Sequence, residues 1–407
     1  MPLGSPVVFP VALAVAAALA AVAPAPQNPP PAAGKPAEGK PTAELVKYKG
    51  RMVTVEERDA LENGLVKYKD RWVTPEEKKA LEKGLVLYGG RWVTAKDKEQ
   101  YDKGLLPVKG KWIPRAEANA AKAKWEDAWE LAGPHFFVRT NANEEVGSEL
   151  LTILEASYPL LKRFYAGAEP PKTGSKKNKT LHDVDVPEEL LPLFVFREKA
   201  EYEAHCAAHN APEQVTSPGY FDSATEVYVT YDGGQGRQQL LSTTVGAMTE
   251  MYCWYAWDDR MPEWFAEGAK RYFESLSWDG TTVKFGKEYS SLMDAVRNGE
   301  KVPMKRMLRV TIASIADQPE RWVWAGQCWG LIHLFMSDAG KPFAKGWSTL
   351  CTNYRAKVNF TDMKGAANTN EAGAKIFEEA FGKEIDALEK ALHEHLASMG
   401  LKPAAPK

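Results

Sequence analysis

The chain has 407 residues, of which 44% are hydrophobic and 26% are charged, and these values are ordinary for a folded protein of two or three domains. The formal net charge of −2 gives no positive field that would attract nucleic acid or an anionic membrane. We therefore predict a folded protein that does not bind nucleic acid.

Residues 1–20 have the pattern of a secretory signal peptide. The apolar run at 7–19 is too short to span a bilayer, and residues 18–20 (Ala-Leu-Ala) offer small side chains at a cleavage site. Because the segment before this run has no Lys or Arg, an uncleaved anchor is the alternative. Residues 21–44 are rich in Ala and Pro and are predicted to be a disordered spacer. We expect an exported protein (periplasmic, in the cell envelope or extracellular) with no stable membrane span after cleavage.

Residues 45–124 form four repeats with a period of twenty residues. The first three units share Leu-Val-x-Tyr, a two-residue turn, and then Arg-(Met/Trp)-Val-Thr, whereas the fourth has diverged. Each unit is predicted to form a strand, a tight turn, a second strand and a helix. The helix N-cap candidates are Thr54, Thr74 and Thr94, and the glycines that end the helices are Gly64, Gly84 and Gly104.

A repeat of this size cannot bury its aromatic residues alone, so neighbouring units are expected to stack or to dock elsewhere. The array is interpreted either as an adaptor that binds a cell-envelope component or as a spacer. Because the units carry their own turns and caps, deletion of residues 1–120 is expected to leave a folded C-terminal domain at 125–398.

The domain at 125–398 is predicted to open with a helix end, a strand and a long amphipathic helix. The expected strands are at 135–140, 193–197, 219–221 and 226–232, and the expected helices are at 125–131, 144–165 and 198–208. His205 and His209 lie four residues apart, which is an acceptable spacing for two metal ligands on one helix face. No Glu lies between them, so a helix face without metal is the favoured interpretation.

The stretch 240–275 is predicted to form two helices joined by a short polar turn. Apolar residues recur at helical spacing through the first helix, and Pro262 suits the first turn of the second. This pair, with Pro-x-Trp-Phe-x-Glu-Gly at 262–268, resembles the gluzincin-type metallopeptidases, especially an exported bacterial group described as peptidase-MA-like. The resemblance implies a thermolysin-like, mostly helical α+β domain with a small mixed sheet.

In that family the first helix carries the motif H-E-x-x-H, and the Glu of the Glu-Gly step is the third zinc ligand. Two histidines four apart bind one Zn²⁺ from one helix face, while the adjacent Glu activates the bound water. The matching window here reads Gly-Ala-Met-Thr-Glu, so Gly246, Ala247 and Glu250 take the places of the first His, the general base and the second His. Glu267 alone remains as a vestigial ligand.

The favoured function is therefore that of an exported, catalytically degenerate metallopeptidase-like protein without a cofactor. It would act as a binding or scaffold module for a peptide or protein through the former substrate cleft. The candidate cleft residues are Tyr252, Trp254, Trp257 and Trp264. The alternative is an active peptidase that holds zinc or another divalent cation with Glu250, Glu263 and Glu267.

The remaining signals concern the core and the C-terminus. Cys206, Cys253, Cys328 and Cys351 could form two disulfides, with Cys328–Cys351 the pairing considered first, or could be four buried thiols. His333 lies in an apolar helix and is interpreted as a core residue. Residues 399–407 are predicted to be a disordered tail.

Overall fold

The computed structural model describes residues 45–62, 64–164, 190–222, 225–234, 236–257, 261–280, 282–357 and 366–399. The predicted signal peptide and spacer and residues 400–407 lie outside this range. The chain divides into two compact units between Asp59 and Ala60. Within the described residues, no helix is both long and apolar enough to cross a membrane.

The first unit holds the first repeat hairpin. Strands β1 (Leu45–Tyr48) and β2 (Arg51–Thr54) pair antiparallel, and α1 (Val55–Glu62) begins directly after them. Both turn residues, Lys49 (φ 45°) and Gly50 (φ 85°), have the left-handed backbone that a two-residue hairpin requires. The Glu57 N–H donates to Thr54 Oγ1 over 3.0 Å, which confirms Thr54 as the N-cap.

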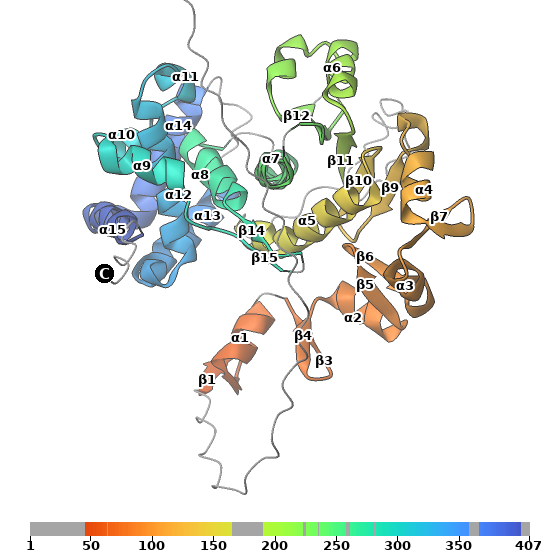
Figure 1. Ribbon diagram of the computed structural model, residues 1–407. Coiled ribbons are helices and arrows are strands. Elements are labelled where there is room, and N and C mark those ends of the chain that lie inside the picture. The colour runs from red at the N-terminus through yellow and green to blue at the C-terminus, as the bar shows by residue number, and fades with distance from the viewer. Residues whose placement is uncertain are drawn as a thin grey trace, which may run out of the picture. The chain divides into compact units, whose positions relative to one another are not determined.

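The second unit begins with three further hairpin–helix repeats (Figure 1). Their elements are β3 (Val66–Tyr68), β4 (Arg71–Val73) and α2 (Pro75–Glu82), then β5 (Leu85–Tyr88), β6 (Arg91–Thr94) and α3 (Ala95–Asp102), then β7 (Leu105–Val108), β8 (Lys111–Pro114) and α4 (Arg115–Ala121). Thr74 and Glu77 form a capping box, and Gly84 and Gly104 follow their helices with left-handed φ values. The predicted order of strand, turn, strand and helix is confirmed.

The third and fourth repeats interlock through aromatic rings. Tyr88 stacks on Tyr101 with ring centroids 4.2 Å apart, and Trp112 meets Tyr101 edge-on at 5.1 Å. The Arg91 guanidinium lies over both tyrosine rings. These aromatic residues pack rather than form an open ligand platform.

The same two repeats dock on α5 (Glu144–Phe164), the long helix of the following domain. Arg91 pairs with Glu144 at 2.5 Å, and the Glu144 side chain is only 2% exposed. The third repeat carries glycine at both turn positions, and a Cβ on Gly90 would lie 2.8 Å from the backbone of Leu151. Packing therefore continues across the predicted domain boundary at residue 124.

A five-stranded mixed sheet lies next in the chain. Its strands are β9 (Trp129–Ala132), β10 (Phe136–Thr140), β11 (Leu191–Phe196), β12 (Gly219–Asp222) and β13 (Val227–Tyr231), in the spatial order β12-β13-β11-β10-β9. The three inner strands are parallel, and the two outer strands are antiparallel to their neighbours. The α+β class with a mixed sheet is thus confirmed.

One predicted element is wrong. Residues 125–131 do not continue a helix but form a 3₁₀ turn at Trp125–Asp127 followed by β9. The reason is a period of two, since Trp129 and Leu131 are buried whereas Glu130 is exposed. Pairing with β10 holds residues 129–132 as a strand.

The two faces of the sheet are covered by different helices. Tyr228, Leu193 and Val138 belong to the large core with α5 and α7 (Arg237–Trp257), whereas the alternate residues Val227, Val229 and Phe194 pack with α6 (Lys199–Ala208).

The other elements are α8 (Glu263–Glu274), β14 (Ser277–Trp278), β15 (Val283–Lys284), α9 (Ser290–Asn298), α10 (Met304–Met307), α11 (Ile312–Ile315), α12 (Glu320–Met336), α13 (Ala344–Lys357), α14 (Ala366–Phe381) and α15 (Ile385–Ser398).

The four cysteines are buried, and His333 is half-buried. All four cysteines are buried and none forms a disulfide in the described structure, so the Cys328–Cys351 pairing is not found. Burial raises the pKa of the Cys328 and Cys351 thiols. His333 lies between His395 at 2.8 Å and the Gly286 carbonyl at 2.9 Å, which agrees with its interpretation as a core histidine.

Candidate functional site

Helices α7 and α8 pack together and bring most of the predicted positions near one another. A Cβ on Gly246 would overlap the Glu274 side chain, so the position of the first His faces a carboxylate of α8. Glu250, at the position of the second His, pairs with Lys270 at 3.0 Å. We name Glu250, Glu267, Lys270, Arg271 and Glu274 the α7/α8 charge cluster.

Arg271 is the centre of this cluster. Its Nε–H donates to Glu267 Oε1 over 2.9 Å, and Nη1 donates to Glu274 Oε2 over 2.7 Å. The three side chains are only 16%, 10% and 6% exposed, in the order Arg271, Glu267 and Glu274. One buried guanidinium thus compensates two buried carboxylates, which is the bridging geometry that arginine favours.

The electrostatics of the cluster are set by burial. Burial raises the pKa of the Glu274 carboxyl, although Arg271 and Lys270 both act to lower it. The pKa of Tyr228, on the neighbouring strand β13, is raised by burial and then by Glu250 and Glu274. The phenol of Tyr228 therefore remains neutral beside the two carboxylates.

The carboxylates proposed as alternative metal ligands do not converge. Glu263 accepts hydrogen bonds from the Ile312 backbone N–H at 2.9 Å and from Asn370 at 3.1 Å, so it joins α8 to α11 and α14. Among the described residues, three ligand-type side chains bring their ligand atoms within 4.8 Å of one another. This group contains neither Glu250 nor Glu267. A cation ligated by Glu250, Glu263 and Glu267 finds no support in this geometry.

The predicted cleft residues have a different role. Tyr252 and Trp264 are both 0% exposed and belong to the hydrophobic core, so they do not line an open cleft. Ala247, at the general-base position, is buried in the same core. The helical backbone at Trp254 and Trp257 lies within α7, but their side chains lie outside the described residues.

An outer strand of the sheet packs against α7. Strand β12 packs against α7, and its Gly219 comes so close to the Tyr228 hydroxyl that a Cβ there would overlap it. Tyr228 belongs to the core that the sheet forms with α7. The outer strand and the α7/α8 charge cluster are therefore connected through α7.

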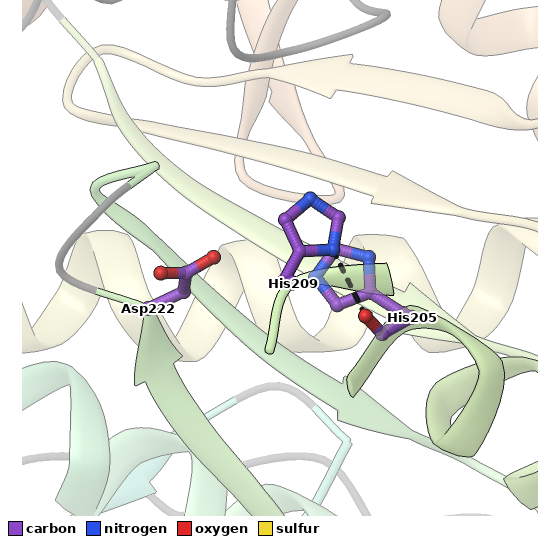
Figure 2. Close-up of side chains that lie close together, drawn as sticks. All are labelled: His205, His209 and Asp222. Atoms are coloured by element: carbon purple, nitrogen blue, oxygen red, sulfur yellow. Dashed lines mark hydrogen bonds between the residues drawn. The ribbon is translucent and has the colours of Figure 1, made fainter. Parts of the chain in front are cut away.

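A second cluster lies on the opposite face of the sheet, where α6 packs. Figure 2 shows the rings of His205 and His209 one over the other, with the Asp222 carboxylate of β12 turned toward them. The ring centroids are 3.9 Å apart with an angle of 25° between the planes, and the ligand atoms of all three residues lie within 4.8 Å of one another. Two imidazoles and one carboxylate are a donor set that suits Zn²⁺ and the neighbouring divalent transition metals Co²⁺, Ni²⁺ and Cu²⁺.

The spacing of His205 and His209 was visible in the sequence, but Asp222 was not connected with them. The only available signal was period two on β12: Tyr220 packs with the α6 side of the sheet, and Asp222 is two residues further on the same face. Phe221 lies between them and packs with the other core. Recognising the triad required knowledge of which sheet face α6 covers.

Comparisons with known proteins do not identify a relative: no protein-family model matches the chain, and no curated protein is significantly similar to it.

The close approach of Gly246 and Glu274 gives a stability prediction. Gly246→Ala should lower the free energy of unfolding by up to about 2 kcal/mol, because overpacking against Glu274 costs about 1–3 kcal/mol, whereas alanine gains ~1 kcal/mol over glycine in a helix. Urea denaturation measures this difference.

The matched control is the same substitution in a Glu274→Ala background. There the added methyl group has space, and we expect Gly246→Ala to be neutral or stabilising. A stabilising effect in the otherwise unchanged protein would contradict the contact between α7 and Glu274.

Proposed function

We propose that residues 125–398 form a non-hydrolytic binding module, related to the gluzincin-type metallopeptidases, in which an ion-pair network has replaced the catalytic metal. The observation that carries the proposal is the pairing of Arg271 with Glu267 and Glu274, together with Lys270 and Glu250. In a zinc site the positive charge that holds such carboxylates comes from the metal. Here two protein cations supply it, and no histidine is present on α7.

Glu267, the proposed vestigial ligand, illustrates the replacement of a metal by an ion pair. A metal at this position would have to displace the Arg271 guanidinium from a side chain that is only 10% exposed. The displaced guanidinium would leave Glu274 without its closest cation. Since an unpaired buried charge is costly, the network favours the metal-free state of this helix pair.

The proposed ligand is an extended polypeptide that adds a strand to the sheet along β12. Among the described strands β12 pairs with β13 alone, and a chain added on its other side would bind through backbone hydrogen bonds with little sequence preference. In the peptidases that the chain resembles, the strand before the zinc helix borders the substrate cleft. Here that strand is β13, which already pairs with β11 and β12, so the proposal places the added chain on β12, which packs against α7. Export, and contact of the repeats with a cell-envelope component, remain part of this proposal.

Amide hydrogen exchange of the full chain, measured with and without the unfolded polypeptide β-casein, tests the proposal. We expect slower exchange of alternate amides in β12 when casein is added, and no change in β9, the outer strand on the other side of the sheet. Casein should remain intact with or without added Zn²⁺. Cleavage of casein that Glu267→Ala abolishes would establish the active-peptidase alternative, and unchanged exchange in β12 would refute polypeptide binding at this edge.

A further inference from the structure

We propose that His205, His209 and Asp222 bind a divalent transition-metal ion, with Zn²⁺ as the best match. The site lies on the α6 side of the sheet, away from the face that α7 covers, and it is independent of the α7/α8 charge cluster. The inference goes beyond the proposed function, because it requires neither peptide binding nor loss of catalysis.

The local fold positions the three side chains. His205 and His209 are one helical turn apart at the end of α6, and the chain reverses at Asn210, which has a left-handed φ of 57°. The 3₁₀ turn at Pro212–Thr216 is fastened to α6 by the Tyr202 hydroxyl, which donates to the Gln214 carbonyl over 2.9 Å. This connection leads into β12, whose last residue is Asp222.

Two of the three ligands are already oriented by hydrogen bonds. His209 Nδ1 lies 2.9 Å from the His205 carbonyl, and because a carbonyl only accepts, this nitrogen carries the proton. The other nitrogen, Nε2, then has the lone pair that a metal needs. The Asp222 carboxylate accepts from the Thr225 hydroxyl at 2.7 Å, on the far side of the hairpin turn. Such outer hydrogen bonds are typical of metal-ligating histidines and carboxylates.

The donor set selects the class of metal. Two imidazole nitrogens and one carboxylate oxygen suit Zn²⁺, Co²⁺, Ni²⁺ or Cu²⁺, whereas Ca²⁺ and Mg²⁺ prefer sites made of oxygen alone. Tetrahedral bonds of about 2.0–2.1 Å place ligand atoms roughly 3.4 Å apart. The separations here are at most 4.8 Å, so closing the site requires the distances between ligand atoms to shorten by up to about 1.4 Å. Three protein ligands leave a fourth position for water.

The neighbouring thiol is excluded as a ligand. Cys206 follows His205 directly and is 0% exposed in the core that α6 forms with the sheet. Its sulfur is not among the ligand atoms of the cluster, which lie within 4.8 Å of one another. The proposed site is therefore one of nitrogen and oxygen donors.

Titration of the full, chelator-treated chain with Zn²⁺ and with Co²⁺, in the absence of peptide, tests the site. We expect one equivalent to bind, and the Co²⁺ form should show visible d–d absorption without a sulfur-to-metal charge-transfer band. His209→Gln and the nearly isosteric Asp222→Asn should each weaken binding by more than 100-fold, and Thr225→Val, which removes the outer hydrogen bond, by about 10–100-fold.

His393→Gln is the matched control, because His393 is a partly buried histidine on α15, outside the cluster. It should bind Zn²⁺ like the unchanged protein, and circular dichroism should show that all variants remain folded. Three results would overturn the proposal. They are binding of only a small fraction of an equivalent of metal, an affinity that neither His209→Gln nor Asp222→Asn changes, and a thiolate charge-transfer band with Co²⁺. Because Asp222 belongs to β12, hydrogen exchange with casein is measured without added metal. Failure of metal binding then leaves the casein result unchanged, and the two proposals fail separately.

Discussion

Arg271→Leu is expected to lower the free energy of unfolding by about 3–5 kcal/mol, because it leaves two buried carboxylates without their shared cation. Urea denaturation of the full chain measures the loss. The combined variant Glu267→Gln, Arg271→Leu and Glu274→Gln should be more stable than the single variant, since it contains no unpaired buried charge.

The stability loss caused by Arg271→Leu should depend on pH, with a definite sign. Burial raises the pKa of Glu274 in the folded protein, and loss of Arg271 removes the strongest influence that lowers it. Above the ordinary glutamate pKa the folded state then binds more protons than the unfolded state, so stability falls as the pH rises through the raised pKa. The deficit of Arg271→Leu should therefore be smaller at pH 5 than at pH 8.

Arg297→Leu is the matched control for this experiment. Arg297 also bridges two carboxylates, those of Glu288 and Asp294, but all three side chains are more than 40% exposed. Its replacement should cost less than about 1 kcal/mol at either pH. Equal losses for Arg271→Leu and Arg297→Leu would mean that the α7/α8 charge cluster is solvated and has no role as a substitute for a metal.

Deletion of residues 1–120 is expected to destabilise the remaining chain by about 1.5–3 kcal/mol or more, contrary to the prediction from the repeats alone. The fully buried Leu106 would no longer contribute about 1.5–3 kcal/mol, and Glu144 would lose its ion pair with Arg91. A chain that begins at residue 85 keeps both contacts and should unfold like the full chain. Thermal and urea unfolding of the two truncated proteins measure the difference.

A point substitution tests the same docking without removing any repeat. Gly90 and Gly110 both have left-handed φ values, of 75° and 77°, but only Gly90 faces the α5 backbone, at 2.8 Å. Alanine at Gly110 should cost about 1–2 kcal/mol for the backbone alone, and alanine at Gly90 clearly more. Equal costs, or a folded and unimpaired chain after deletion of residues 1–120, would contradict docking of the third repeat on α5.

The sequence alone determined the features that depend on neighbouring residues. The repeat period, the hairpin turns, the Thr74 cap and the terminating glycines follow from local backbone preferences, and all were predictable. The two helices at 240–275 also followed from periodicity and Pro262. Residues 125–131 were predicted wrongly because the alternation of buried residues in β9 has meaning only beside β10.

Tertiary structure decided which charges and ligands meet. Helix periodicity places Glu267 and Arg271 on one face, but it does not reveal that Glu274 approaches Gly246 on α7 or that Lys270 pairs with Glu250. In the same way, the spacing of two histidines on α6 does not indicate Asp222, which comes thirteen residues after His209 along the chain. The physical reason is that local preferences act over about one helical turn, whereas these contacts depend on which sheet face each helix covers.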